Sequence, residues 1–488
     1  MRVAPFRAVL IATSLLFAAC APAKGPTARS PVVTTAAMVE PAPRIEVAGA
    51  VTPSLIRIDK DQEVTVRVRV HGLPLTNKKR PPLDLALVLD TSGSMEGKPM
   101  DDARAACSKL IDLVGDGDFV SIVTFGSHAK VIVPAVRVDK ESRAKAKLAL
   151  RNIAAQGTTD MTAGLAEGLT QINAPLATNP EMSNAIRRIV LVGDGVPNDA
   201  PSVLALADNA GAQHVPVTVL GLGNDFDETL MTALAQRSSG TFHFVDDASR
   251  VAVVFQEQIS RMERVVARGA RIELTPGPGV TITELVGIPS STNGHVQVAG
   301  LGDLVEGQTR DVFVRVAAKG RQDGSSIELL DAQVSYTLPE SGAAELSSSV
   351  FLKSGASSDA ARLHDAVVMD VEHGATSMRV ADGIVKAIAS AREGDVPGAR
   401  KILDAAIRLA KEGKNKFADE SFTARVTEMS ALRKTLPSLA PQSASMSKPD
   451  SPDKAAAQLA PRPAASAPAE AMELRAAHGD AMKALQGE

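Results

Sequence analysis

Aromatic residues are scarce in this sequence of 488 residues, which has no tryptophan and one tyrosine. Surfaces that stack sugars or nucleic-acid bases are built from such rings, so a function of that kind is not expected. The formal net charge of −3 gives no excess of lysine and arginine, which nucleic-acid-binding domains concentrate on one face. The composition therefore argues against a nucleic-acid partner. The length is that of about two or three domains.

Cysteine is also rare, and the two cysteines, Cys20 and Cys107, cannot form a framework of several disulfides. Cys20 follows a short basic start and the apolar stretch 8–19, which is too short to span a membrane as a helix. Together with Cys20, the preceding residues Leu16-Phe17-Ala18-Ala19 resemble the lipobox of bacterial lipoproteins. Leucine is more usual at the position of Phe17. The alternative is an ordinary secretory signal that happens to contain a cysteine.

The lipobox resemblance implies that residues 1–20 are a lipoprotein signal peptide and that Cys20 carries the lipid. In such lipoproteins an alanine after the cysteine, here Ala21, implies sorting to the outer membrane. Several acyl chains on one cysteine are enough for stable membrane anchoring. We therefore expect a protein of the cell envelope, anchored to the outer membrane through Cys20.

An α/β domain is predicted for residues 83–262. Strands that are apolar throughout alternate there with amphipathic helices, and such strands are buried on both faces of a sheet. The pattern favours a doubly wound, mostly parallel sheet, with strands expected at Leu85–Leu89, Phe119–Phe125, Ile189–Val192, Val217–Leu220 and Thr241–Val245.

Further β strands are predicted on both sides of this domain. Residues 44–82 include the stretch Glu63–Val70, in which apolar and polar residues alternate. Residues 263–355 contain short alternating strands separated by turns such as Pro276–Gly279. We expect the two sets to form one all-β sandwich into which the α/β domain is inserted.

Three other segments complete the expected organisation. Residues 21–43 are rich in proline, alanine and threonine and are predicted to form a disordered tether. Residues 358–435 carry apolar residues at helical spacing and are predicted to be helical. Residues 436–488 are predicted to be a Pro/Ala-rich disordered tail, with a short amphipathic helix near Ala469–Leu485.

The first candidate site lies directly after the apolar strand at residues 83–89. The sequence Asp90-Thr91-Ser92-Gly93-Ser94 offers one carboxylate and two serine hydroxyls. Hard divalent cations such as Mg²⁺ prefer oxygen ligands of this kind. The stretch therefore points to a metal ion before it points to catalysis.

Two later loops offer similar groups. Thr159 precedes a predicted helix, and Asp194 follows a second apolar strand. Loops at the carboxyl ends of parallel strands converge on one crevice, so these loops and the one after Asp90 are expected to form one metal site. The alternative is that the serines only cap the following helix and that Asp194 only starts a turn.

The order Asp-x-Ser-x-Ser, then Thr, then Asp-Gly resembles the von Willebrand factor type A (VWA) domain with an intact metal-ion-dependent adhesion site. The resemblance covers about a third of the chain, from Leu83 to Met262. It implies that neutral hydroxyls bind the ion directly and that the two aspartates act mainly through water. The implied ligand set is Asp90, Ser92, Ser94, Thr159 and Asp194.

The match leaves a choice between two threonines and includes one departure from the family pattern. Thr159 is preferred over Thr158 because its spacing to Gly164-Leu165 fits the family pattern. Gly193 stands where the family often has threonine, a departure that removes no ligand.

Other chemistries lack their motifs. The eight histidines show no HExxH or Cys–His spacing for zinc. Ser92 stands where a phosphoryl-transferring aspartate enzyme would need a second acid, and no Gly-x-Ser-x-Gly elbow is present. Gly221-Leu222-Gly223 lacks the third glycine of a dinucleotide-binding loop, so no nucleotide is expected.

These observations predict a non-enzymatic, metal-dependent protein-binding lipoprotein of the bacterial envelope, acting in adhesion or as a scaffold. Mg²⁺ is the expected ion, with Mn²⁺ or Ca²⁺ as alternatives, and it would bind an Asp or Glu carboxylate of the partner. The competing hypothesis is a scaffold in which the ion is structural and the sandwich or helical region carries the interaction. An enzyme is not expected because no general base accompanies the site.

Overall fold

The computed structural model describes residues 43–58, 60–75, 81–193, 199–222, 228–245, 248–339, 345–439, 478–482 and 484–485. The chain divides into two units, Met1–Ala42 and Pro43–Glu488, and every described residue belongs to the second. The predicted signal peptide, the lipidation site Cys20 and the predicted tether up to Ala42 lie outside the described residues.

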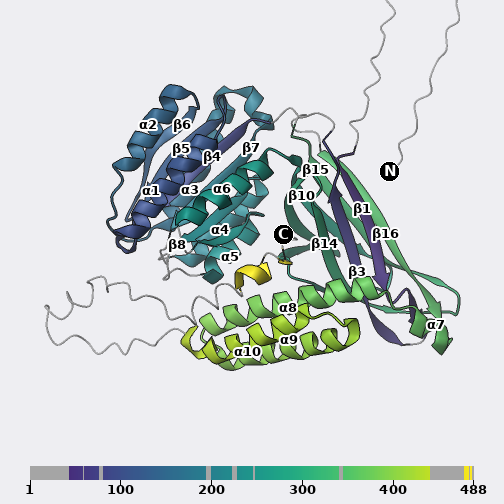
Figure 1. Cartoon of the computed structure of the whole chain (residues 1–488). Helices are drawn as coiled ribbons and strands as arrows, with labels where there is room; N and C mark the ends of the chain where they lie inside the picture. The colour runs from purple at the N-terminus through teal and green to yellow at the C-terminus, as the bar shows by residue number, and fades with distance from the viewer. Residues whose placement is uncertain are drawn as a thin grey trace, which may run out of the picture. The chain divides into compact units, whose positions relative to one another are not determined.

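A six-stranded sheet forms the centre of the α/β domain (Figure 1). Its strand order is β6-β5-β4-β7-β8-β9, and only β6 runs antiparallel to its neighbour. The strands are β4 (Leu83–Asp90), β5 (Phe119–Phe125), β6 (Ala129–Arg137), β7 (Ile186–Gly193), β8 (Val217–Leu222) and β9 (Phe242–Val245). The sheet is mostly parallel, as predicted, and each predicted strand falls on an observed one.

Strand β6 was not predicted, and its sequence explains why. It is partly exposed along its length and lies at the edge of the sheet, so it lacks the continuous apolar run of the buried strands. It also contains Pro134, which falls where the pairing with β5 is irregular, between the partners of Val120 and Ile122. Proline cannot donate a ladder hydrogen bond and is tolerated at edges and bulges.

Helices cover both faces of this sheet because successive side chains of each strand point to opposite faces. Leu83, Leu85, Leu87 and Leu89 of β4 pack on the side of α1 (Lys98–Leu113), α2 (Lys140–Arg151) and α6 (Ala248–Met262). Ala86 and Val88 pack on the side of α3 (Met161–Thr178), α4 (Ala200–Ala212) and α5 (Glu228–Arg237). Two short 3₁₀ helices, η1 (Gly93–Met95) and η2 (Pro180–Asn184), complete the domain.

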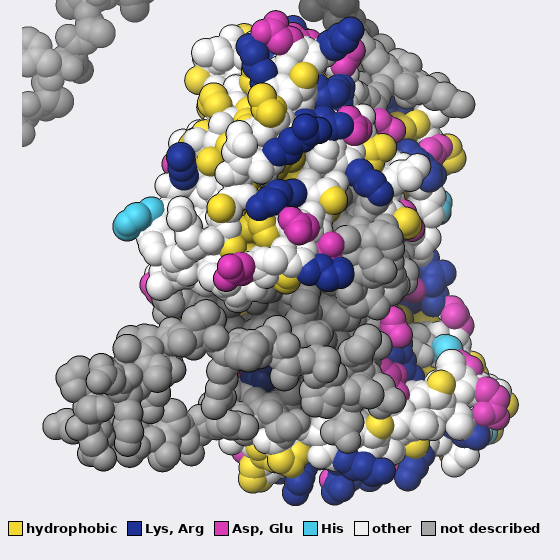
Figure 2. Space-filling view, turned by 60° about the vertical axis from the view of Figure 1, so that its left-hand side comes forward, with side chains coloured by type: hydrophobic (Ala, Val, Ile, Leu, Met, Phe, Trp, Pro, Cys, Tyr) yellow, Lys and Arg dark blue, Asp and Glu magenta, His cyan; other side chains and the backbone are white. Residues whose placement is uncertain are grey.

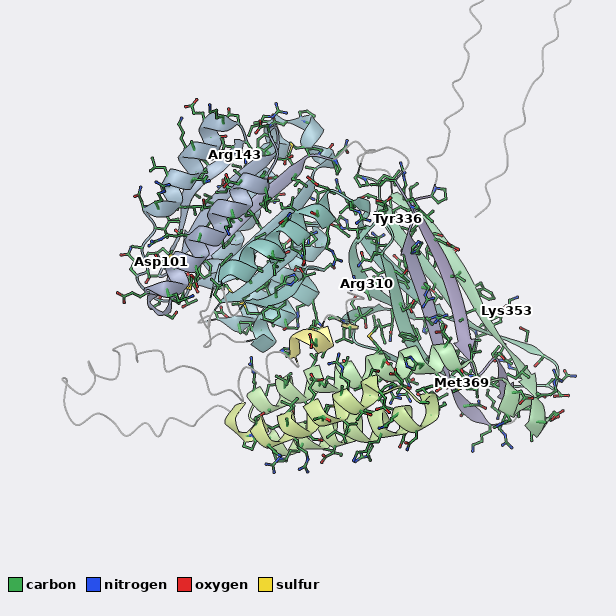
Figure 3. The ribbon with its side chains drawn as sticks, viewed as in Figure 1. Asp101, Arg143, Arg310, Tyr336, Lys353 and Met369 are labelled. Atoms are coloured by element: carbon green, nitrogen blue, oxygen red, sulfur yellow. The ribbon has the colours of Figure 1, made fainter. Side chains whose placement is uncertain are left out.

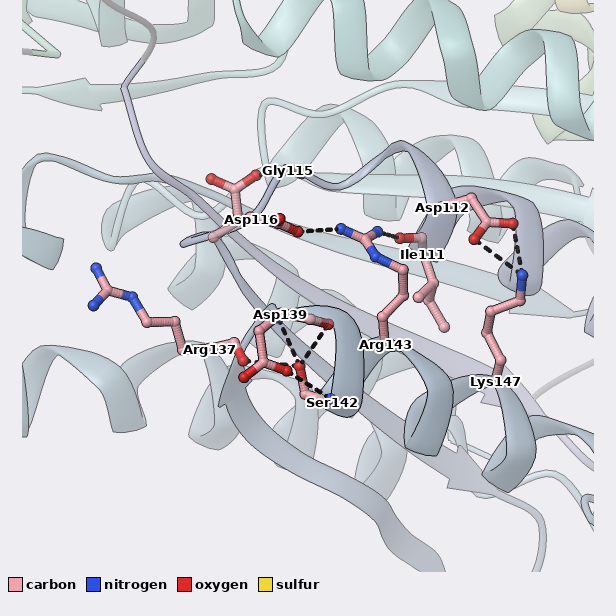
Figure 4. A network of polar contacts seen from close by, with 10 residues as sticks. Ile111, Asp112, Gly115, Asp116, Arg137, Asp139, Ser142, Arg143 and Lys147 are labelled. Atoms are coloured by element: carbon pink, nitrogen blue, oxygen red, sulfur yellow. Dashed lines mark hydrogen bonds and ion pairs between the residues drawn. The ribbon is translucent and has the colours of Figure 1, made fainter.

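Polar contacts join α2 to α1 and to the loop after α1 (Figure 4). The guanidinium of Arg143 donates to the Ile111 carbonyl and, at 2.9 Å, to Asp116. Lys147 Nζ lies 2.7 Å from a carboxylate oxygen of Asp112. Exposed ion pairs of this kind each contribute little stability, so the buried apolar side chains hold these helices in place. On the face drawn in Figure 2, basic and acidic side chains are interspersed.

A two-sheet β sandwich flanks the α/β domain in the sequence. One sheet has the order β1-β3-β14-β11 and the other β12-β13-β10-β15-β16-β2. The first sheet consists of β1 (Ile45–Thr52), β3 (Asp61–Gly72), β11 (Thr281–Leu285) and β14 (Thr309–Lys319). The second consists of β2 (Leu55–Arg57), β10 (Val265–Pro276), β12 (Ser290–Asn293), β13 (Val296–Val305), β15 (Ser326–Thr337) and β16 (Glu345–Ser357).

In the sequence, the α/β domain lies between strands of the sandwich that pair with one another. Strand β3 precedes that domain in the sequence and pairs along its length with β14, which follows it. Alternate residues of β3, Val64 to Val70, are buried between the sheets. Tyr336, the one tyrosine of the chain, is buried in β15 and accepts a hydrogen bond from the Arg44 backbone at 3.2 Å (Figure 3).

The helical region follows the sandwich and consists of α7 (Ala360–Asp365), α8 (Met369–Arg392), α9 (Val396–Phe417) and α10 (Ser421–Leu439). One apolar cluster joins α8, α9 and α10. The start of α8 packs on the sandwich, where Phe313 of β14 is buried against Val371 and Ala375. At the same place Arg67 of β3 forms a 2.6 Å ion pair with Asp370.

The segment predicted as a disordered tail, residues 436–488, begins with the end of a helix, and a helix also lies within the stretch Ala469–Leu485 where a short amphipathic helix was expected. Helix α10 continues to Leu439 because Leu436 is buried in the helical cluster. Residues 478–482 and 484–485 are also helical, and three of their apolar side chains are buried in the same cluster. Residues 440–477 lie outside the described part. In the described part of the chain, no helix is both long enough and apolar enough to cross a membrane.

Candidate metal site

The loop after β4 holds its polar side chains in fixed positions. Asp90, the last residue of β4, is fully buried, and its Oδ1 accepts a 2.7 Å hydrogen bond from the Ser92 backbone. Thr91 anchors the loop to β5, since its hydroxyl donates to the Phe125 carbonyl at 2.9 Å and its backbone N–H donates to the same oxygen. The Oγ atoms of Ser92 and Ser94 lie 3.0 Å apart. The two predicted serine ligands are therefore neighbours.

The loop that carries Thr159 lies beside this first loop. The Gln156 backbone donates to the Thr91 carbonyl at 2.5 Å, and the Gly93 backbone donates to the Gly157 carbonyl at 3.1 Å. Gly157 has a φ of +89°, a conformation that glycine adopts without strain. The structure thus brings together two of the three loops that the sequence predicted to converge.

The two adjacent threonines of this loop have different environments. Thr158 is exposed, and both its backbone and its hydroxyl bond to the Ser127 hydroxyl, at 3.1 and 3.3 Å. Thr159 is 9% exposed. Thr159 therefore lies on the inner side of the loop, and Thr158 on the outer side.

The third loop follows β7, which pairs in parallel with β4. The last residue of β7, Gly193, lies close to Asp90. A Cβ atom on Gly193 would lie 2.7 Å from the Asp90 Cβ. Glycine at this position thus allows β7 to end against Asp90, which gives a physical reason for the departure from threonine. Asp194 comes next in the sequence but lies outside the described residues.

The alternative role of the serines as helix caps finds little support. Ser92 precedes η1, but its side chain makes no capping hydrogen bond. Gly97, rather than Ser94, precedes α1. The hydroxyls of Ser92 and Ser94 are paired with each other instead.

The donor set fits a small hard cation. In octahedral Mg²⁺ coordination with ligands at about 2.0–2.1 Å, adjacent oxygens are about 3 Å apart. The observed 3.0 Å between the Ser92 and Ser94 hydroxyl oxygens matches that separation. Over the described ranges, no group of three or more His, Cys, Asp or Glu side chains could hold a metal ion.

Ser127 is a residue of this region that the sequence analysis missed. It follows β5 at the same edge of the sheet and holds the Thr158 loop through its hydroxyl. The sequence feature that could have identified Ser127 is its position two residues after an apolar strand. Polar residues at the strand ends of parallel sheets line the ligand crevice.

The family model of the von Willebrand factor type A domain matches residues 84–258. This range begins in β4, ends in α6 and contains both loops described above. Residues 84–258 are therefore similar to VWA domains in sequence and are called the VWA domain below. The predicted α/β fold class is confirmed by this match and by the sheet order.

Several curated proteins are similar in sequence to parts of this chain. A Synechocystis protein described as uncharacterised is 27% identical over 58% of this chain and 68% of its own length. An inter-alpha-trypsin inhibitor heavy chain of Mesocricetus auratus is 29% identical over 34% of this chain. The uncharacterised protein YfbK of Escherichia coli is 25% identical over 44% of this chain. The matches span 18% of the heavy chain and 38% of YfbK.

Two solved structures share the fold over most of the chain. A von Willebrand factor type A protein from Catenulispora acidiphila has a TM-score of 0.62 at 18% identity and covers 78% of this chain and 88% of that structure. The VWA2 paralog of ArnB from Sulfolobus acidocaldarius has a TM-score of 0.55 at 15% identity, and the match covers 81% of this chain and 96% of that structure. At these identities the likeness establishes the fold, including sheets beyond the VWA domain.

Proposed function

We propose that the VWA domain binds an acidic residue of a protein partner through a divalent cation, with Mg²⁺ as the expected ion and Mn²⁺ or Ca²⁺ as alternatives. The residues proposed to hold the ion are Asp90, Ser92, Ser94, Thr159 and Asp194. The observation that carries the proposal is the pairing of two serine hydroxyls, at the separation of adjacent metal ligands, beside a buried aspartate.

Each described residue has a specific task in this proposal. Asp90 accepts a hydrogen bond from the Ser92 backbone and so fixes the position of the Ser92 hydroxyl. Ser92, Ser94 and Thr159 are neutral and leave the charge of a bound cation uncancelled. The cation would supply an open coordination position that attracts the carboxylate of a partner.

The site is proposed to bind rather than to catalyse. A nucleophilic serine needs a base within hydrogen-bond reach. The Ser92 hydroxyl is instead paired with the Ser94 hydroxyl, which is not a base. No histidine of the described segments is hydrogen-bonded to Ser92.

We further propose that lipidated Cys20 anchors the protein to the outer membrane. The support for this part is the lipobox-like sequence before Cys20. Replacing Cys20 by alanine is expected to move the protein from the membrane fraction to the soluble fraction after cell lysis. Continued retention of the Cys20→Ala variant in the membrane fraction would contradict lipid anchoring.

Affinity capture from envelope extracts tests the binding proposal. Wild-type protein is expected to retain a partner in Mg²⁺ buffer and to release it in EDTA. Asp90→Ala and Ser92→Ala should abolish retention, whereas the exposed Thr158→Ala variant should retain the partner. Circular dichroism would verify that each variant is folded. Equal retention in EDTA would contradict the metal bridge and favour the scaffold hypothesis.

A further inference from the structure

The end of the chain contains a short amphipathic helix far in sequence from the rest of the helical region. Residues 478–482 and 484–485 are helical, and we call residues 478–485 the C-terminal segment. Its buried side chains are those of His478, Ala481, Met482 and Leu485. Their spacing of i, i+3, i+4 and i+7 places them on one face of a helix, the pattern by which helices dock into grooves.

Three parts of the fold contact this segment. Ala481, Met482 and Leu485 belong to the apolar cluster of α8, α9 and α10. The Gln236 side chain of α5, in the VWA domain, donates to the Met482 sulfur at 3.6 Å. The short helix, drawn in yellow, lies close to α5 and α8 in Figure 1. One segment therefore contacts both the VWA domain and the helical region.

The sandwich supplies the third contact, at the turn after β11. Gly287 there has a φ of +69°, and a Cβ atom on it would lie 2.3 Å from Leu485 Cδ2. Leu485 also lines a small cavity together with Gln236, Gly240 and Pro289. A side chain at residue 287 would overlap Leu485 in its present position, so the glycine leaves room for it.

A helix of this length is only marginally stable in water by itself, so it exists by virtue of the surface on which it docks. The surface under the segment is contributed by other elements, namely α5, the turn at Gly287 and α10. The apolar face of a short helix that packs on such a surface is a recognised mode of helix binding.

We propose that the C-terminal segment is a detachable strap, which docks in cis on this surface and fastens the VWA domain to the helical region. The surface accepts one apolar helix face with a small residue, a methionine and a leucine in the order found at 481, 482 and 485. Release of the strap frees α5, and the surface then accepts a helical peptide of the same pattern.

Matched variants of the full chain test the proposal. Leu485→Asp places a charge in the buried contact, whereas Ala484→Asp places the same charge on an exposed position of the same segment. Leu485→Asp is expected to raise amide hydrogen exchange in α5 and at residues 286–289 by at least about tenfold. Ala484→Asp should exchange like wild type.

Peptide binding separates a strap from a part of the fold. A labelled synthetic peptide of residues 474–488 should bind Leu485→Asp and restore slow exchange in α5, and it should not bind wild type. Unchanged exchange in Leu485→Asp would overturn the proposal. Loss of the overall circular dichroism signal in that variant would also overturn it, because the segment would then be needed for folding. Analytical ultracentrifugation would detect a further outcome. If wild type is a dimer and Leu485→Asp is a monomer, the segment docks on a second copy of the chain, and the proposal of docking in cis is wrong.

Discussion

Arg188 of β7 and Asp303 of β13 form an ion pair at 3.0 Å, with side chains 9% and 8% exposed. The pair joins the VWA domain to the sandwich, and the second Asp303 oxygen accepts a 2.9 Å hydrogen bond from the Gly269 backbone. Removing Asp303 takes a carboxylate away from a buried guanidinium and leaves the Gly269 N–H without its acceptor. Asp303→Ala is therefore expected to lower the free energy of unfolding by about 3–5 kcal/mol in urea titrations.

The control for this prediction is the exposed ion pair between Arg237 and Asp208, which is 2.9 Å long. Asp208→Ala should change the free energy of unfolding by less than about 1 kcal/mol, because water screens exposed pairs. Similar effects of the two substitutions would show that the buried pair does not fasten the domains.

The contact between Gly193 and Asp90 predicts that a larger residue at position 193 is unfavourable in this chain. In Gly193→Ala the new methyl group would overlap Asp90, so Asp90 must move. We expect a loss of about 1–3 kcal/mol of stability and weaker metal binding. Gly93→Ala is the control, since the nearest atom to a Cβ there is 3.7 Å away. Thermal unfolding and metal titration would measure both; a tolerated Gly193→Ala would contradict the close approach.

Asp84 gives the protein a pH-dependent stability. It is buried at the start of β4, its Oδ2 has no hydrogen-bond partner among the described residues, and this burial raises its pKa to about 7 from 3.8. The folded state therefore holds the proton more tightly than the unfolded chain. This contribution is complete below about pH 4 and is lost as the pH rises through about 7.

The variant Asp84→Asn should remove that dependence. Between about pH 5 and pH 7, wild type is expected to lose up to about 1.4 kcal/mol of unfolding free energy per pH unit relative to Asp84→Asn. Urea unfolding of both proteins at several pH values measures the difference. A difference that stays constant across this range would show that Asp84 is already ionised in the folded protein.

Cys107 is predicted to be unreactive in the folded protein. It is fully buried on the inner face of α1, and burial raises the pKa of its thiol to about 12. Only a thiolate reacts readily with iodoacetamide. In the Cys20→Ala background, mass spectrometry should find no alkylation of native protein near neutral pH and full alkylation in urea. Equal labelling in both conditions would place the thiol at the surface.

The sequence predicted those elements whose patterns are local. The run Leu83–Leu89 is apolar at nearly every position and became the buried strand β4, and Asp90 at its end lies where the strand-end rule placed it. Thr159, the threonine chosen as a ligand from the local spacing, is the more buried of the two adjacent threonines. In each case a few adjacent residues carry the whole signal.

Features formed by distant residues could not be predicted in this way. Docking of the C-terminal segment depends on Gln236, Gly287 and α10, which are separate in the sequence, and its apolar positions follow a Pro/Ala-rich stretch that suggested disorder. The need for glycine at 193 arises from the distance between two neighbouring strands rather than from either strand alone.

The central claim is that hydroxyl groups at the carboxyl edge of the VWA sheet hold a divalent cation. The most direct test is titration of the metal-free protein with Mn²⁺, followed by electron paramagnetic resonance, for wild type, Thr159→Ala and Thr158→Ala. Wild type is expected to bind one ion per chain, with at least about tenfold weaker binding in Thr159→Ala and unchanged binding in Thr158→Ala. Absence of binding to wild type, or equal binding by all three proteins, would contradict it.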